Sequence, residues 1–183
     1  GLLIIGISFS SCSKNDDDIE IIESLPEYPM KTLIENGIME LKSTKINSAV
    51  TFELGYKFKS FKNGKITALG IRVPENDVYR VTLWNADTEE ILKTVDVTSS
   101  SGLLSFEDIQ PVNIESGTEY FVSLNTNDYY IFNDDGNTVF PAEIDDILVM
   151  GYGSKIGQNQ FLPTQLVKTT YLGMVDIKFI ANN

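Results

Sequence analysis

The sequence predicts an all-β fold, an antiparallel β-sandwich of the jelly-roll or Ig-like Greek-key kind. Short segments rich in β-branched and aromatic residues recur about every ten residues, and several alternate apolar with polar side chains. Turn signals built from Gly, Asn, Asp, Ser and Pro separate these segments. No long segment shows the period of an amphipathic helix, so a sandwich or barrel is favoured over alternating β and α units.

The strands are predicted in order along the chain. The first begins at residue 51, because four apolar residues alternate there with polar ones: Phe52, Leu54, Tyr56 and Phe58. Asn63-Gly64 then supplies a hairpin turn, and residues 65–73 form the second strand. Further strands are predicted at 78–84, 91–97, 103–106, 119–124, 129–132, 146–150 and 174–180. Residues 30–41 fit either a short helix or strands, and Gly37 makes a helix less stable.

Length and composition predict one folded domain and a segment outside its core. The chain has 183 residues, of which 42% are hydrophobic and 22% charged, as in ordinary globular proteins. We divide it into a signal-peptide remnant (1–12), an acidic tether (13–31) and a β-sandwich domain (32–183).

The first twelve residues predict a lipid anchor. Residues 2–9 form an apolar run that is far shorter than the ~20 residues of a membrane-spanning helix. Ser10, Ser11 and Cys12 follow, and the arrangement resembles a bacterial lipoprotein signal, although Phe9 stands where Leu is usual. The resemblance implies acylation of Cys12 and attachment to a membrane through that lipid. The alternative is that Cys12, the single cysteine, is a buried thiol on an N-terminal strand.

The acidic tether predicts that the protein is located at the cell surface. Asp16, Asp17 and Asp18 open an acidic stretch, and Pro26 and Pro29 are expected to break any helix there. An acidic run directly after the acylated cysteine resembles the export signal of surface-exposed outer-membrane lipoproteins. An outer-membrane protein exposed at the cell surface is therefore expected, with the periplasmic leaflet as the alternative. The run also fits an ordinary solvated linker.

Charge and composition exclude several classes of function. There are 14 Lys and Arg against 26 Asp and Glu, so the formal net charge is −12 and nucleic acid is not an expected partner. The chain has no His, which removes Ser-His-Asp catalysis and His-ligated zinc. The Asn133–Asn137 turn lacks the ligand spacing of a calcium-binding EF-hand loop, so neither a metal nor a cofactor is expected. Neighbouring acids such as Glu89-Glu90 are typical of solvated turns, and a glycosidase is the less favoured interpretation.

Five short segments together resemble the bacterial family called domain of unknown function 4082. They are LGYKF at 54–58, GKIT at 64–67, VTLW at 81–84, PVNI at 111–114 and GTEY at 117–120. Residues 172–179 are similar to a terminal strand of related lipoproteins. The resemblance implies a β-sandwich of secreted and cell-surface proteins, and it implies no activity.

Two groups of aromatic residues are candidates for ligand binding. Trp84 belongs to the family-like LW segment and is expected in the core, with sugar stacking as the alternative. Tyr129, Tyr130 and Tyr152 belong to a second aromatic concentration, and we predict a ligand site in the loops around Tyr130 and Tyr152. Because both faces of 129–132 are apolar, a strand covered on both sides is the alternative.

The sequence therefore predicts a cell-surface lipoprotein without catalytic activity that presents a binding or adhesive β-sandwich. Glycans are the leading ligand class. The alternative is a structural or accessory subunit of a surface assembly, which binds a protein partner by adding strands at a sheet edge. A glycan-binding protein would present exposed aromatic residues in one concave patch, whereas an assembly subunit would present a long unprotected edge strand.

Overall fold

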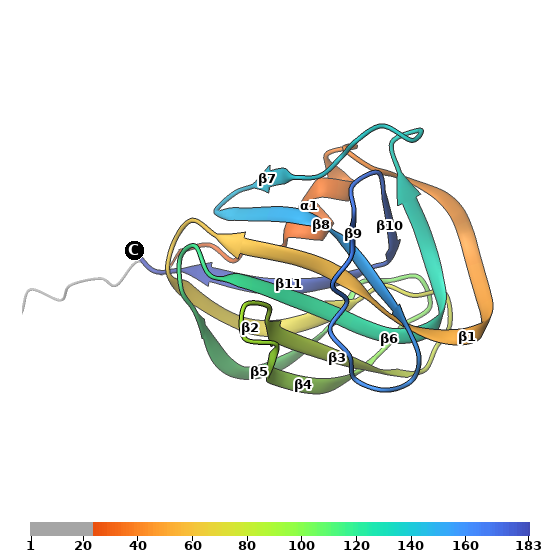
Figure 1. Ribbon diagram of the computed structural model, residues 1–183, viewed down its shortest axis with the longest axis horizontal. Helices are drawn as coiled ribbons and strands as arrows, with labels where there is room; N and C mark the ends of the chain where they lie inside the picture. The colour runs from red at the N-terminus through yellow and green to blue at the C-terminus, as the bar shows by residue number, and fades with distance from the viewer. Residues whose placement is uncertain (1–23) are drawn as a thin grey trace, which may run out of the picture.

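The chain folds into a β-sandwich, as the sequence predicts, in a computed structural model that describes residues 24–183 (Figure 1). For residues 43–46 it describes the backbone alone. Cys12 and residues 13–23 of the expected tether lie outside the described residues. No helix within 24–183 is long and apolar enough to cross a bilayer.

One short helix and eleven strands make up the described chain. They are α1 (Pro29–Glu35), β1 (Glu40–Ser60), β2 (Gly64–Ile71), β3 (Val78–Asn85), β4 (Glu90–Thr98), β5 (Ser105–Ile114), β6 (Glu119–Asn133), β7 (Ala142–Ile144), β8 (Ile147–Ile156), β9 (Leu166–Val167), β10 (Thr170–Gly173) and β11 (Val175–Ala181).

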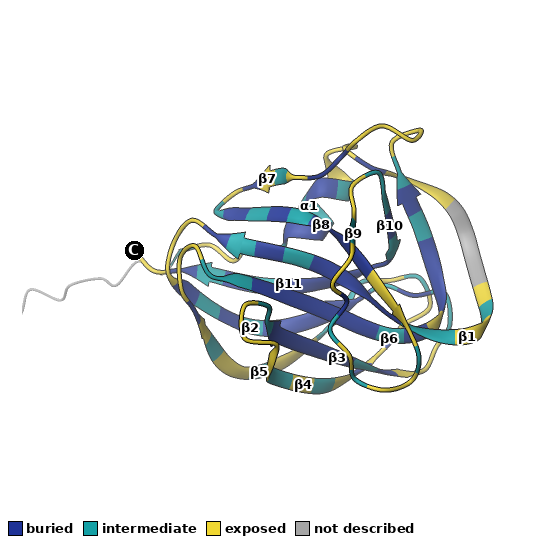
Figure 2. Cartoon of the chain, in the orientation of Figure 1, coloured by how far each residue is buried: buried dark blue, intermediate teal, exposed yellow. Residues whose placement is uncertain are grey.

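Two antiparallel sheets enclose the core. The larger has the order β4-β3-β6-β1-β8-β7, with β10 added to β6 and β9 added to β8, and the smaller has the order β11-β2-β5. The alternation predicted in β1 is present, since Leu54, Tyr56 and Phe58 are all buried in the core. They share it with Ile66 of β2 and Phe179 of β11, and Figure 2 shows the buried residues along both sheets.

The centre of the large sheet is the long pair of β1 and β6. The register places Leu54 opposite Leu124 and Tyr56 opposite Val122. The two strands predicted at 119–124 and 129–132 are one strand, because Asn125 and Thr126 continue the pairing with β1. The first part of β6 also pairs with β3, and its last part pairs with β10.

The N-terminal segment differs from the expected tether. Pro29 begins α1 instead of breaking it, because the first position of a helix needs no N–H donor. Glu27 forms a backbone bridge with Phe179 of β11, and Met30 is fully buried. Residues 27–31 therefore pack on the sandwich, although the sequence predicts its start at residue 32.

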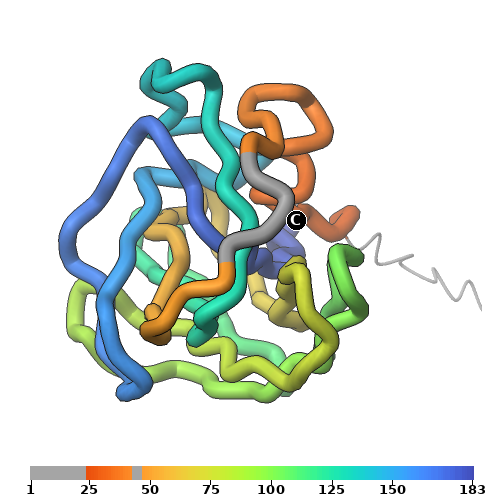
Figure 3. Tube along the Cα trace, turned by 90° about the vertical axis from the view of Figure 1, so that its right-hand side faces the viewer, coloured from red at the N-terminus to blue at the C-terminus, as the bar shows by residue number. Residues whose placement is uncertain are grey.

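A loop after β8 covers the outer face of the large sheet. This covering loop (residues 157–165) leads from β8 to β9, and Figure 3 shows its blue segment along the outer side of the molecule. Gly153 lies in β8, where a Cβ atom would stand 3.0 Å from Phe121 and from Pro163 of the loop. The missing side chain lets the loop lie close to the sheet.

Candidate functional site

The aromatic residues predicted to bind ligand lie inside the sandwich. Tyr129 and Tyr130 are each 9% exposed, and Tyr152 is 2% exposed. Tyr152 packs edge-on against Tyr171, with ring centroids 5.8 Å apart, and Tyr171 lies 6.3 Å from Phe132. Tyr130, whose ring lies 6.3 Å from Phe132, and Tyr152 therefore belong to one buried aromatic layer, whereas Tyr129 packs edge-on against Phe52. The part of the three tyrosines in ligand binding stays a prediction.

Tyr130 lies between this aromatic layer and a cavity. Its ring lies under the guanidinium of Arg72, whose central carbon is 5.5 Å from the ring centroid. Its hydroxyl lies so near Gly102 that a Cβ atom there would be 2.9 Å away. Gly102 also has a φ of +77°, a backbone conformation that favours glycine.

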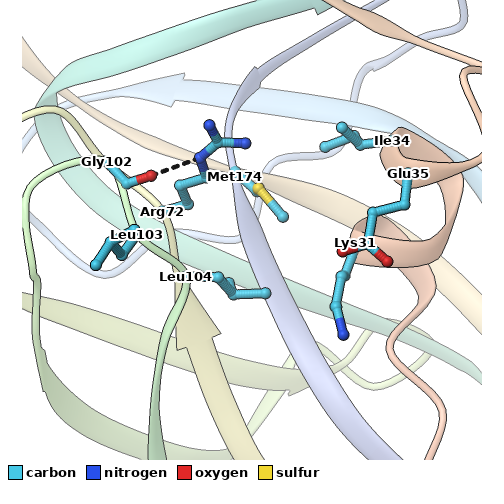
Figure 4. A pocket seen from close by; sticks show the side chains of 8 residues that line it. All are labelled: Lys31, Ile34, Glu35, Arg72, Gly102, Leu103, Leu104 and Met174. Atoms are coloured by element: carbon cyan, nitrogen blue, oxygen red, sulfur yellow. Dashed lines mark hydrogen bonds between the residues drawn. The ribbon is translucent and has the colours of Figure 1, made fainter.

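The cavity lies between α1 and the turn that contains Gly102, and its volume is about 220 Å³ (Figure 4). Figure 4 shows that its lining comes from two sides: Lys31, Ile34 and Glu35 from α1, and Arg72, Leu103, Leu104 and Met174 from the sandwich. Leu103 stands at the rim and is 67% exposed, whereas Met174 is buried. Most of the lining is apolar, with charged groups at a few points, which is typical of small-ligand sites.

Arg72 is fixed in the cavity wall. Its Nε donates a hydrogen bond of 2.7 Å to the carbonyl oxygen of Gly102. Its backbone N–H donates to the carbonyl oxygen of Met174 at 2.9 Å. Figure 4 shows the two terminal nitrogens of the guanidinium on the side away from Gly102. Together with the Tyr130 ring, these contacts hold the guanidinium in one orientation.

The backbone next to Arg72 is strained. Met174 has a φ of 148°, which is unusual for a residue with a side chain, and Gly173 before it has a φ of 99°. Residues held in such conformations are found more often at ligand sites than elsewhere. The strain therefore marks the wall of the cavity that Met174 lines.

Asp176 positions α1 beside the cavity. Its fully buried carboxylate accepts hydrogen bonds from the backbone N–H groups of Met30 at 3.1 Å and Lys31 at 2.9 Å. The Tyr56 hydroxyl lies 3.4 Å from the same carboxylate. Burial raises the pKa of Asp176 to about 7. The backbone N–H donors lower this pKa, but their effect is smaller than that of burial. The first turn of α1, with Lys31, is thereby fixed to β11.

Trp84 is buried on the outer face of the large sheet, beneath the covering loop. It is 3% exposed, and its indole Nε1 donates to Ser123 Oγ at 3.0 Å. Ser123 Oγ in turn donates to Glu53 at 2.6 Å, and Arg80 donates to the same carboxylate at 2.8 Å. Since Arg80 also donates to the carbonyl oxygen of Gln158, this polar cluster holds the loop on the sheet.

Acidic residues also meet near the first described residues, without making a metal site. Glu27 accepts a hydrogen bond of 3.0 Å from the backbone N–H of Asp146. Burial, together with the charges of Asp146 and Asp145, raises the pKa of Glu27 to about 7. Lys62 pairs with Asp146 at 2.9 Å. Within residues 24–183 no group of three His, Cys, Asp or Glu side chains could hold a metal ion.

Sequence reasoning missed the residues that line the cavity. Lys31 lies within the predicted tether, Arg72 lies near the end of a predicted strand, and Gly102 follows three serines; these positions are far apart in the sequence. The one local signal was Gly102 in a Ser-Gly turn, which indicates a positive φ but not a ligand site.

Comparison with known proteins supports the family resemblance. No curated protein matches the chain. The model of the family described as domain of unknown function (DUF4082) matches residues 41–170, which include the five segments quoted above. This match spans more than half of the chain, and the chain therefore belongs to the DUF4082 family.

Proposed function

We propose that this protein is a non-catalytic binding protein of the bacterial cell surface that takes a glycan in the cavity between α1 and the Gly102 turn. The observation that carries the proposal is the fixed guanidinium of Arg72 beside an apolar wall of Ile34, Leu104 and Met174. Sugars are bound in this way, with apolar C–H faces on apolar side chains and hydroxyls on a few charged groups.

Binding is favoured over hydrolysis by the charges of this cavity. A glycosidase needs two carboxyl groups about 5 to 9.5 Å apart on either side of the bond to be cleaved. Among the described residues that line the cavity, Glu35 is the one that carries a carboxylate. A single acid together with Lys31 and Arg72 is suited to hydrogen bonding with hydroxyl groups.

The expected location belongs to the same proposal. Acylation of Cys12 would fix the chain to a membrane, and the acidic residues that follow would hold the sandwich away from it. Display on the outer membrane fits a glycan ligand, because surface glycans are in reach there. The periplasmic leaflet is the alternative location.

Strand addition to a partner is the alternative function, and the edges of the small sheet argue against it. The small-sheet edge strand β5 carries the exposed residues Glu107, Asp108 and Pro111. Charges and proline on an edge strand oppose pairing with another chain. On the opposite edge of that sheet, Glu27 already bridges β11. These features favour ligand binding in the cavity over assembly through the small sheet.

A glycan array tests the proposal. We expect the protein to bind a related group of glycans and Arg72→Gln to lose that binding. Lys168→Gln is the matched control, because it removes the same charge from an exposed position that does not line the cavity. An array without reproducible binding by the wild-type protein would overturn the glycan proposal.

A further inference from the structure

We infer that the cavity selects a sugar that carries a carboxylate, of the uronic acid class, and that Arg72 is the residue that recognises it. This inference rests on the proposed function and names its ligand class. The orientation of Arg72, the size of the cavity and the placement of its charges support it.

The guanidinium is oriented for a planar anion. The Gly102 carbonyl occupies Nε, and the Tyr130 ring supports the guanidinium from one side. The edge that carries the two terminal nitrogens is directed away from Gly102, as Figure 4 shows. Two parallel N–H groups match the two oxygens of a carboxylate, and such bidentate pairs are stronger than hydrogen bonds between neutral groups.

The size of the cavity fits one sugar ring. An apolar cavity of ~150 Å³ holds a bare six-membered ring, and this one, at about 220 Å³, leaves room for ring substituents. Leu104 and Met174 supply apolar surface for the C–H face of the ring. Because Leu103 at the rim is largely exposed, a neighbouring sugar of a longer chain can extend into solvent there.

The charges favour one carboxylate in one place. Lys31 and Arg72 line the cavity in a chain whose formal net charge is −12, so the cavity is more basic than the protein as a whole. Glu35 lines the cavity from α1 and can accept hydrogen bonds from sugar hydroxyls, but it repels a second carboxylate on its own side. A sugar with a carboxylate at one end and hydroxyls at the other fits this arrangement.

Tyr130 is a positioning residue for Arg72. It does not line the cavity, but its ring holds the Arg72 guanidinium. Removal of the ring should weaken binding of an acidic sugar, whereas Tyr130→Phe keeps the ring and should retain binding.

The test compares sugars that differ only in the carboxylate. The wild-type protein is titrated with D-glucuronate and D-galacturonate and, in parallel, with D-glucose and D-galactose, and amide chemical shifts are followed by NMR. We expect the uronates to shift the amides of residues 31–35, 102–104 and 174 and to bind about tenfold or more tightly than the neutral sugars. Arg72→Gln should remove this preference, as should Arg72→Lys, which keeps the charge but not the planar pair of donors.

The titration tests separately the preference for a carboxylate, the role of Arg72 and the binding of a sugar in the cavity. If neutral sugars shift the same amides with equal affinity, the inference about the carboxylate is wrong and the proposed glycan binding stands. If Arg72→Lys and Arg72→Gln bind uronates as tightly as the wild-type protein does, with thermal unfolding showing that both variants fold, Arg72 is not the recognising residue. Absence of any shift with all four sugars overturns the inference, and the glycan array then decides the proposed function separately.

Discussion

Three carboxylates are buried in the sandwich, and each is held by several hydrogen bonds. Glu53, Asp128 and Asp176 are at most 3% exposed. Glu53 has Arg80 as its cationic partner, and Asp128 accepts from the Tyr79 hydroxyl at 2.7 Å. The described donors to Asp176 are backbone N–H groups and a tyrosine hydroxyl, so its charge is not balanced by a cation. Burial without a cation makes the stability of the fold sensitive to pH at this residue.

Asp176 predicts that the protein is less stable at pH 8 than at pH 5. The pKa of an unfolded Asp is about 3.9. In the folded protein burial raises the pKa of Asp176 to about 7, so between these values only the folded state holds the proton. Raising the pH through this window therefore favours unfolding, by about 1.4 kcal/mol per pH unit at most. Urea unfolding between pH 5 and pH 8 measures the slope.

Asp176→Asn should flatten this pH dependence, because an amide keeps an acceptor oxygen but does not ionise. Glu27, whose pKa is also raised to about 7, contributes in the same direction, so Glu27→Gln should remove a further part. The chain has no His to titrate in this range. An equal slope in the wild-type protein and in Asp176→Asn would contradict the prediction.

Trp84 should stabilise the fold although it lies outside the main core. Trp84→Ala leaves a cavity between the sheet and the covering loop and removes the donor to Ser123, so we expect a loss of ~3–5 kcal/mol of unfolding free energy. Trp84→Phe fills most of the space and should lose less. Urea melts followed by circular dichroism measure both. A loss below ~1 kcal/mol for Trp84→Ala would mean that the covering loop closes over the gap.

At the scale of elements, α1 and the segment before it are expected to be required for stability. A chain that begins at Thr32 lacks Met30, which is fully buried, and lacks two of the N–H donors to Asp176. We expect it to lose several kcal/mol relative to a chain that begins at Ser24, since removal of one large buried side chain alone costs ~2–5 kcal/mol. Equal melting temperatures of the two chains would show that residues 24–31 contribute little to the fold.

The strands that alternate clearly could be predicted, and the elements defined by distant partners could not. Residues 52–58 alternate because one face of β1 meets the core, and this local pattern is visible in sequence. The first half of β1 and the strands β7, β9 and β10 have no such pattern and depend on pairing with β6 or β8. Helix α1 is short and is capped by Asp176, 145 or more positions away, so no local signal shows its first turn.

The candidate site also depends on residues that are distant from one another in the sequence. The aromatic concentration in the sequence predicts a ligand site around Tyr130, and the structure buries Tyr130 next to the cavity without placing it in the lining. Arg72 and Gly102 meet through a hydrogen bond across 30 positions, and Met174 joins them from the far end of the chain. Such a site depends on the tertiary fold, and a single sequence shows only the types of residue that it contains.

At the scale of the whole molecule, the two ends of the described chain lie together. Ser24 Oγ donates to the Asn183 side chain at 2.6 Å, and the C-terminus is labelled at this end in Figure 1. A tether that precedes residue 24 would therefore hold the sandwich by one end. The long axis of the sandwich would then be free to extend from a membrane.

Cys12 is expected to carry the lipid that anchors the protein. In the organism's own membrane system, we expect an alkyne-labelled fatty acid to be incorporated into the wild-type protein, and Cys12→Ala to abolish the label and to release the protein from the membrane fraction. Two or three acyl chains make attachment effectively permanent, whereas a single chain is marginal. Electrostatic attraction should not retain the variant, because residues 13–23 hold five acids and one Lys and are repelled by anionic headgroups. If the label persists in Cys12→Ala, the lipoprotein interpretation is wrong. If the unlabelled variant stays in the membrane fraction after a high-salt wash, something other than the lipid attaches the protein.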